Sequence, residues 1–300
     1  MNLFCISVDT IPNVRLTGHV IYNEPWMHFT RTIDEYILYV IKSGELYIKE
    51  GEEEFVLKSG DTLLLEPKIQ HTGYRKSTCD YYYIHFKHPK ITTLNVNSLD
   101  EIAFNILNER KTSLASDFLS DSLPTSPVCY LPKCYHIKNL SPIIYLLKEA
   151  EFDYYNRYEN YKILTSIRLI EILIKISREY ISSEMEKSTS FLSKGFIKCR
   201  NIINFLNSEY HRKITSQDIE TYFESNYDYL NRVFHKLTGY TIFNYLNIIR
   251  INKAKELIDT TPIKFSEVGY LVGIDDPYYF SKLFKKYVGM TPSQYSKSKC

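Results

Sequence analysis

Short runs of β-branched and aromatic residues, four to seven residues long, recur along the first ninety positions of the chain. They occupy residues 35–41, 45–48, 54–57, 62–65 and 81–86. Turn-forming sequences separate them, at 42–44, 50–51, 58–61 and Pro67. Evenly spaced short strands with no helix between them predict an antiparallel barrel or jelly roll.

The last of these strands alternates in a way that leaves its orientation open. Tyr83 and His85 share one face of the strand, and Ile84 and Phe86 share the other. Either pair of side chains can line the interior of a barrel, so the sequence does not decide which face of the strand points inward.

Helical periodicity appears only after residue 140. Residues 91–140 have little apolar periodicity, and Ser, Thr and Pro gather at 112–127, which predicts a surface connection. Helices are expected at 142–156 and 161–180. The second helix has two apolar stripes, one of which we expect to pack on the barrel. The stripes are Ile163, Ile167, Ile170, Ile174 and Ile181 on one side, and Leu169, Ile172, Leu173 and Ile176 on the other.

The last third of the chain has the pattern of short amphipathic helices with explicit caps. A helix is expected at 195–210, a capping box at Thr215–Asp218 opens a second, and Asn226 caps a third that runs to Leu237. Residues 241–259 form one longer helix, of about 28 Å at 1.5 Å per residue.

Residues 262–292 predict two short helices joined by a tight turn. Val268, Leu271 and Val272 give the first helix an apolar face, and Gly273 supplies the turn. Phe280, Leu283 and Phe284 point inward from the second helix, which carries lysines on its outer face. Gly289 ends this helix, and Thr291–Pro292 begins another. A compact helix pair with a basic second helix is the usual shape for contacting a DNA major groove.

This stretch resembles the second helix-turn-helix of AraC/XylS-type bacterial transcription regulators. The resemblance rests on Gly273, Tyr279-Phe280-Ser281, Phe284-Lys285, Gly289 and Pro292 at the spacing of that family. Tyr229-Leu230, Arg232–Lys236 and Gly239 resemble the family's first helix-turn-helix. That first unit departs from the family twice, because Glu220 replaces a small residue and Glu224 replaces the turn glycine.

The front of the chain resembles the cupin sensor domain of the same family. Glu35, Tyr39, Ser43-Gly44, Gly60-Asp61, Pro67, His71 and residues 83–86 carry this likeness. The implied fold class is α+β. A cupin-like antiparallel β-barrel with a helical dimerisation segment spans 1–181, and a linker spans 182–194. An all-α DNA-binding domain spans 195–300, with helix-turn-helix units at about 215–237 and 263–287.

The resemblance implies two sets of site residues. DNA contacts are expected from the outer faces of the two recognition helices, at Asn226, Tyr227, Asn231, Arg232, His235, Pro277, Tyr278, Tyr279, Lys282, Lys285 and Lys286. A small-molecule effector is expected to contact Trp26, His28, Tyr39, His71, Tyr83 and His85. Aromatic faces with hydrogen-bonding tips suit sugars and other polar organic molecules.

Metal catalysis was weighed against this sensor function. Metal-dependent cupins carry His-x-His, but the corresponding residues here are His28-Phe29-Thr30, which leaves only His28, Glu35 and His71 as ligands. The six cysteines form no CxxC pair, so no zinc site is predicted from them. We expect no metal, no cofactor and no enzymatic activity.

Charge and hydropathy agree with a cytoplasmic DNA-binding protein. The whole chain has a net charge of +2, but residues 194–300 contain 16 Lys and Arg against 10 Asp and Glu, so the basic excess lies where DNA contacts are expected. The sequence contains no signal peptide pattern, and charges interrupt its longest apolar helix.

The sequence therefore predicts a transcription regulator, and specifically an activator, that an effector controls through the barrel. Its expected partners are promoter DNA, RNA polymerase, the effector and a second copy, through an antiparallel pairing of the 161–181 helix. Two alternatives stay open: a cupin enzyme or metal-binding protein with accessory DNA binding, and a regulator that acts through dimerisation or a protein partner without an effector.

Overall fold

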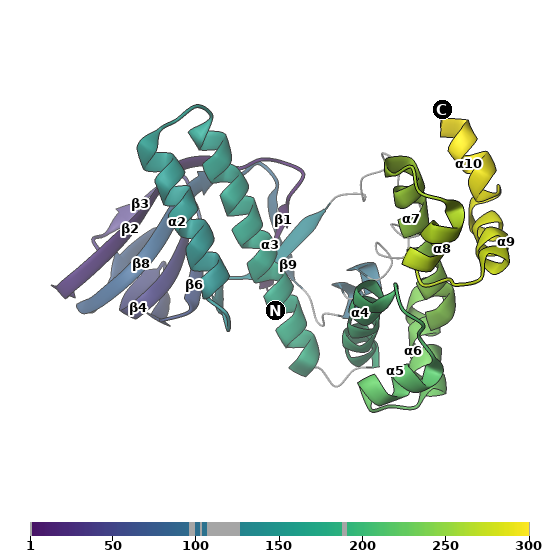
Figure 1. Cartoon of the computed structure of the whole chain (residues 1–300). Coiled ribbons are helices and arrows are strands. Elements are labelled where there is room, and N and C mark those ends of the chain that lie inside the picture. The colour runs from purple at the N-terminus through teal and green to yellow at the C-terminus, as the bar shows by residue number, and fades with distance from the viewer. Residues whose placement is uncertain (1, 96–99, 103, 107–126, 188–190, 300) are drawn as a thin grey trace. The chain divides into compact units, whose positions relative to one another are not determined.

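The computed structural model describes residues 2–95, 100–102, 104–106, 127–187 and 191–299 (Figure 1). The chain forms two compact units. The first comprises Met1–Ser98 and Thr125–Glu184, and the second comprises Leu99–Pro124 and Met185–Cys300. All of the expected surface connection at 112–127 except its last residue lies outside the described residues.

Two antiparallel sheets build the first unit. One has the strand order β10-β1-β9, from β1 (Asn2–Ser7), β9 (Ile91–Asn95) and β10 (Val128–Pro132). The other has the order β11-β6-β4-β7-β3, while β8 pairs with β2 and β4, and β5 pairs with β4. Its strands are β2 (Asn13–Trp26), β3 (Arg31–Thr32), β4 (Tyr36–Glu50), β5 (Glu53–Lys58), β6 (Asp61–Leu65), β7 (Gln70–Gly73), β8 (Ser77–Lys87) and β11 (Cys134–His136).

Two local expectations about this unit are wrong. Residues 42–44 form no turn, because β4 runs through them with a register shift between Ile41 and Ser43. Gly44 has a φ of +78°, and a Cβ there would lie 2.3 Å from the Thr78 carbonyl oxygen, so glycine lets the two strands stay paired. The region 91–140 is also more regular than expected, since it supplies β9, β10 and β11.

The two faces of β8 enter different cores, which answers the question that its alternation left open. Tyr81 and Tyr83 belong to a cluster inside the barrel with Tyr39 and Ile37. Tyr82, Ile84 and Phe86 lie on the opposite face, in a cluster that also contains residues of β1, α2 (Ser141–Asn156) and α3 (Tyr161–Lys187). Figure 1 shows α2 and α3 side by side over this face of the sheet.

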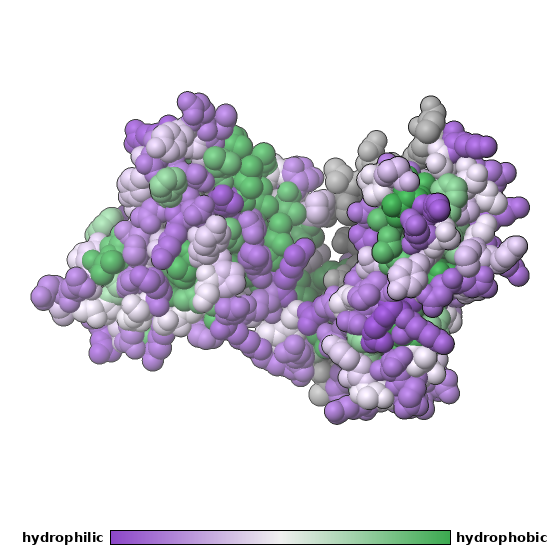
Figure 2. Space-filling model, viewed as in Figure 1, coloured by the Kyte–Doolittle hydropathy of each residue, from purple (hydrophilic) through white to green (hydrophobic). Residues whose placement is uncertain are grey.

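The two stripes of α3 have different surroundings. Leu169, Ile172, Leu173 and Ile176 are buried in the cluster that joins the helices to the sheet, as expected. On the other stripe Ile163 and Ile167 are 48% and 45% exposed. Figure 2 shows hydrophobic side chains gathered over α3. The helix ends at Lys187 rather than near 181, and the next one begins at Phe191. Because 188–190 lie outside the described residues, the bounds of the linker at 182–194 stay a prediction.

The second unit is helical throughout its described part from residue 191. Its helices are α4 (Phe191–Glu209), α5 (Ser216–Phe223), α6 (Tyr227–Thr238), α7 (Ile242–Thr260), α8 (Phe265–Leu271), α9 (Pro277–Val288) and α10 (Pro292–Lys299). The expected caps are present: Thr215 and Asp218 form a capping box on α5, and Asn226 caps α6. Asp276 caps α9, and Gly289 ends it with a left-handed conformation. The α+β class with an all-α second unit is therefore confirmed.

One expected core residue of this unit lies on the surface. Leu271 is 48% exposed, whereas Val268 and Val272 are buried with Phe280 and Phe284. The reason is that α8 ends at Leu271, and Val272 adopts a non-helical conformation that continues into Gly273. The turn therefore points Leu271 away from the core.

Candidate nucleic-acid interface and ligand site

Both proposed recognition helices present a buried face and an exposed polar face. On α6, Leu230, Val233 and Phe234 are buried, while Arg232 and His235 are exposed. On α9, Phe280, Leu283 and Phe284 are buried, and the exposed residues are Pro277, Tyr278, Tyr279, Lys282, Lys285 and Lys286. Tyr278 is 90% exposed, which is unusual for a side chain of that size in the absence of a partner.

Three of the candidates on α6 have a structural role. The Asn226 side chain accepts a hydrogen bond from the Tyr229 N–H at 3.2 Å and so caps the helix. Asn231 Oδ1 accepts from the Ile242 N–H at 2.9 Å and ties α6 to the start of α7. Tyr227 is half-buried, and its ring lies 5.5 Å from that of Phe243. The polar atoms of Arg232 and His235 are thus better placed for a ligand than those of Asn226 and Asn231.

The turn between α5 and α6 uses both residues that depart from the family pattern. Glu224 ends α5 in a left-handed conformation, with a φ of 47°, where glycine is the ordinary residue. Glu220 Oε1 accepts hydrogen bonds from the Tyr227 N–H at 2.7 Å and from Asn226 Nδ2 at 3.3 Å. Its carboxylate therefore accepts a hydrogen bond from a free N–H in the first turn of α6, and so links α5 to the start of α6 across the turn.

Glu224→Gly is expected to stabilise the second unit by about 1 kcal/mol, because it removes the cost of a left-handed conformation with a Cβ. Chemical denaturation followed by far-ultraviolet circular dichroism measures this change. The matched control is Gln217→Gly, in the first turn of α5, which relieves no left-handed conformation and is expected to lower stability by up to about 1 kcal/mol. A loss of stability in Glu224→Gly would show that the carboxylate, rather than the backbone, dominates at this position.

The second helix-turn-helix is joined to the rest of its unit through Arg250 of α7. The guanidinium is buried, and it donates hydrogen bonds to the Tyr210 carbonyl at 2.9 Å and to the Arg212 carbonyl at 2.7 Å. A Cβ on Gly273 would lie 2.8 Å from Arg250 Nη2 and 2.5 Å from the Tyr210 oxygen. Glycine at the turn thus lets α7, the end of α4 and the α8–α9 turn meet at one point.

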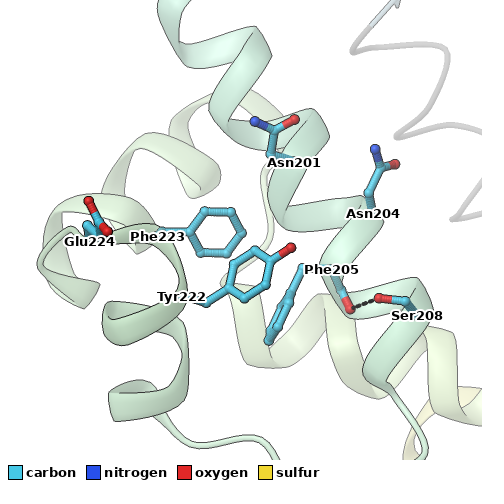
Figure 3. A pocket seen from close by; sticks show the side chains of 7 residues that line it. All are labelled: Asn201, Asn204, Phe205, Ser208, Tyr222, Phe223 and Glu224. Atoms are coloured by element: carbon cyan, nitrogen blue, oxygen red, sulfur yellow. Dashed lines mark hydrogen bonds between the residues drawn. The ribbon is translucent and has the colours of Figure 1, made fainter.

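A hollow of about 620 Å³ opens on the second unit between α4 and the end of α5 (Figure 3). The rings of Phe205, Tyr222 and Phe223 line it, together with the polar side chains of Asn201 and Asn204. None of the predicted DNA contacts lines it.

The predicted effector residues come together inside the first unit. His28 Nε2 lies 3.0 Å from the Tyr39 hydroxyl, and the His28 and His71 rings are 5.5 Å apart. The Tyr83 and His85 rings are 5.6 Å apart, and the Trp26 ring lies 5.4 Å from that of His28. His28, Tyr39, His71 and His85 are buried, whereas Trp26 and Tyr83 are half-buried. Their role in binding an effector stays a prediction.

Sequence reasoning missed the residue at the centre of this group, which is Arg31. Its Nε donates to His71 Nε2 at 2.9 Å, and its Nη2 lies 3.2 Å from the Tyr39 hydroxyl and 3.5 Å from His85 Nε2. Arg31 lies on the two-residue strand β3, where it pairs directly with His71 of β7. A strand this short has no alternation by which to find it.

Burial and the charge of Arg31 keep the three histidines neutral. Desolvation, together with repulsion from Arg31, lowers the pKa of His28, His71 and His85 to about 4 each. The same burial raises the pKa of Tyr39 to about 12. Near neutral pH the group therefore consists of one guanidinium surrounded by uncharged rings.

The three residues weighed as metal ligands do not converge on one point. The Glu35 carboxylate forms an ion pair with Arg15 and lies 3.3 Å from His85 Nδ1, and the Arg31 guanidinium binds His71. Over the described ranges, no group of three or more His, Cys, Asp or Glu side chains is arranged to hold a metal ion. A guanidinium beside the histidines also repels a cation.

Comparison with known proteins accounts for both units. Residues 19–121 match the model of the AraC-like ligand binding domain, and residues 221–298 match a helix-turn-helix domain model. The chain is 26% identical to YisR of Bacillus subtilis, described as an uncharacterized HTH-type transcriptional regulator, over 97% of this chain and 96% of the relative. It is 25% identical to the Msm operon regulatory protein of Streptococcus mutans, over 88% of this chain and 84% of the relative.

A solved structure is similar to about a third of the chain. It is the C-terminal domain of the response regulator yesN from Fusobacterium nucleatum, 34% identical, covering 32% of this chain and 95% of that one with a TM-score of 0.32. Among the described helices, none combines the length and the apolar character that crossing a membrane requires.

The chain matches a ligand-binding domain model in its first half and a helix-turn-helix model near its end. It also resembles transcription regulators over most of its length. The chain belongs to the AraC/XylS family of transcription regulators, with an N-terminal cupin-like ligand-binding domain and a C-terminal helix-turn-helix DNA-binding domain.

Proposed function

We propose that this regulator is a cytoplasmic activator that binds promoter DNA through α6 and α9 and responds to a small molecule held by the Arg31 group of the barrel. The observation that carries the proposal is the pair of exposed helix faces on one compact unit. The buried residues of α9 belong to a cluster with residues of α7 and α8, α6 has its own buried face, and the 19-residue α7 lies between α6 and α8 in the chain.

The length of α7 supports binding to two successive major grooves by one chain. Nineteen residues span about 28 Å, and successive major-groove faces on one side of a duplex lie about 34 Å apart. The remaining difference is small enough for the widths of the two helices and modest DNA bending to close.

Substitution of the exposed cations separates base recognition from phosphate contact. Arg232→Ala is expected to relax base preference at one position, because arginine pairs with guanine in the major groove. Lys286→Ala is expected to weaken binding to all sequences alike and to reduce the salt slope by about 1. Fluorescence anisotropy with a promoter duplex and single-base variants at several salt concentrations measures both. An unchanged base preference in Arg232→Ala would remove α6 from the recognition surface.

We further propose that two chains pair through the first turns of α3, where the start of this stripe is exposed. Ile163, Leu164 and Ile167 are each at least 40% exposed on the first turns of the helix. A contiguous apolar surface of this kind on a soluble unit favours self-association. Ile174 packs on the unit's own core and Ile181 is buried, so the two helices are proposed to cross antiparallel at their first turns.

Ile167→Glu is expected to convert dimer to monomer, since it places a charge in the centre of the apolar stripe. Analytical ultracentrifugation of the full chain measures the change. Lys162→Glu, at an exposed position on the same helix, is the matched control and is expected to leave the dimer intact. A dimer that survives Ile167→Glu would place the contact elsewhere.

The activator role and the contact with RNA polymerase follow from how such a regulator acts when it binds next to a promoter. A reporter fused to the chain's own promoter region is expected to rise with the protein and effector present and to fall when Tyr278 and Lys282 are both replaced by alanine. A reporter that rises upon deletion of the protein would make it a repressor.

A further inference from the structure

The charge of Arg31 has no acidic counterpart in the described part of the chain. Its three contacts are His71, Tyr39 and His85, and no ion pair joins it to a carboxylate there. The nearby carboxylate of Glu35 is already engaged by Arg15 and His85. One positive charge is therefore held in the barrel without compensation.

The hydrogen bonds around Arg31 fix its neighbours as acceptors. Arg31 Nη2 can only donate, so His85 Nε2 accepts from it and Nδ1 carries the ring proton, which it donates to Glu35 Oε2; Arg15 Nη2 also lies 3.3 Å from Nδ1. His28 Nδ1 lies 2.8 Å from the Phe29 carbonyl and donates to it, so its Nε2 accepts from Tyr39. The rings and the hydroxyl that contact the Arg31 guanidinium are thus uncharged.

Part of the guanidinium remains available to a ligand. The hydrogen bonds of Arg31 use Nε and Nη2, and no described residue accepts from Nη1. The Nη2 contacts, at 3.2 and 3.5 Å, are long for hydrogen bonds to a charged donor. An anion could exchange for them and bind through Nη1 and Nη2 together. Arg31 is also half-buried rather than fully enclosed.

An aromatic wall stands next to the guanidinium. The Phe29 ring lies 5.0 Å from the Arg31 Cζ and is 57% exposed. Trp26 lies 6.3 Å from Phe29 and stacks on Tyr22 at 4.0 Å. Exposed Met27 lies between Trp26 and His28 in the chain. A ligand bound at Arg31 would therefore place the rest of its body against apolar and aromatic surface.

From these contacts we infer that the effector is a small organic acid: its single carboxylate binds Arg31, and its apolar body lies against Phe29 and Trp26. This inference rests on the proposed effector function and specifies its ligand class. A single negative charge matches the single uncompensated positive charge, whereas a phosphate dianion would leave an excess negative charge among neutral rings. Uncharged sugars would leave the guanidinium uncompensated.

Matched pairs of probes test the carboxylate directly on the full chain. Benzoate and hexanoate are compared with benzamide and hexanamide, which have the same shape without the charge, and with glucose and inorganic phosphate. Trp26 is the only tryptophan in the chain, so its fluorescence reports binding next to the aromatic wall. At least one acid is expected to bind about 10-fold or more tightly than its amide.

Three variants assign the effect to Arg31. Arg31→Gln is expected to weaken binding of the acid at least about 10-fold, and Arg31→Lys, which keeps the charge but loses the planar fork, is expected to give an intermediate loss. Arg75→Gln is the matched control, because it removes the same charge from an arginine that contacts Tyr47 instead. Circular dichroism verifies folding, and the comparison of acid with amide in the unmodified chain needs no variant.

The outcomes separate this inference from the proposed function. Binding of glucose that Arg31→Gln leaves unchanged would overturn the carboxylate but retain a small-molecule effector. Tighter binding of phosphate than of both acids would overturn it in favour of a different anion. Equal binding of acid and amide, or no binding of either acid at about 10 mM, would also overturn it.

Discussion

Arg250→Met is expected to lower the free energy of unfolding of the second unit by about 2–4 kcal/mol and to abolish DNA binding at a physiological temperature. Methionine keeps the length of the buried stem, but it removes both charge-assisted hydrogen bonds and leaves the Tyr210 and Arg212 carbonyls without this donor. Burial lowers the pKa of Arg250, although the group stays charged. Its loss also frees the α8–α9 turn, which closes against the guanidinium through Gly273.

The matched control for this prediction lies one turn further along the same helix. Lys253→Met removes a cation that pairs with Glu256 on the surface, at 2.8 Å, and a pair of this kind contributes little to stability. Thermal unfolding by circular dichroism and anisotropy with promoter DNA measure both variants. If Arg250→Met unfolds at the same temperature as Lys253→Met, the buried guanidinium does not hold the two halves of the unit together.

Lowering the pH from about 7 toward 4 is expected to destabilise the first unit by several kcal/mol. A histidine has a pKa near 6.5 in the unfolded chain, whereas the folded pKa of His28, His71 and His85 is about 4. The unfolded chain therefore binds more protons below pH 6.5, so the stabilisation is present above that pH and is lost as pH falls toward 4. A single histidine whose pKa falls from 6.5 to about 4 on folding changes the free energy of unfolding by about 3 kcal/mol over this pH range.

The charged and polar groups around the three histidines reduce the total loss of stability at low pH. Arg31 on β3, Tyr39 on β4 and Tyr83 on β8 face them from inside the barrel, and Arg15 and Glu35 face His85 from β2 and from the segment before β4. Glu35 offsets part of the shift of His85, because its carboxylate favours the charged ring. The total is therefore smaller than the sum of three independent histidines.

Urea unfolding at pH 7, 6 and 5, followed by the fluorescence of Trp26, measures the stability of this unit without interference from the other. His71→Gln is expected to reduce the pH dependence, and His136→Gln, at an exposed position paired with Asp61, is expected to leave it unchanged. A midpoint that does not fall between pH 7 and pH 5 is incompatible with buried neutral histidines.

The sequence predicts the helices and strands well where a segment is long enough to show a period of 3.6 or two residues. The apolar runs of β4, β6 and β8 and the inward residues of α6 and α9 are buried as expected. The bulge at Gly44 was mistaken for a turn because Lys42–Gly44 has the composition of both. The expected burial of Leu271 is wrong because a helix of seven residues is too short for its period to show where it ends.

The centre of the ligand site could not be predicted because its contacts are not local. Arg31 reaches His71, Tyr39 and His85 only after β3 pairs with β7 and β4 pairs with β8. The sequence did indicate the aromatic and histidine side chains, since these alternate along recognisable strands. A lone arginine before a turn of polar residues carries no comparable signal. The compensating role of Glu220 in the α5–α6 turn was hidden for the same reason, because it depends on a contact seven residues away.

The most direct test of the central claim, that one chain holds two DNA-contacting helices, is a hydroxyl-radical footprint of the full chain on its own promoter. We expect protection of two major-groove segments for each bound chain, about one helical turn or 10–10.5 base pairs apart on one face of the duplex. Replacing Tyr278 and Lys282 together by alanine is expected to remove one segment and leave the other. A single protected groove for each chain, or the loss of both segments at once in a variant that stays folded, would contradict this account.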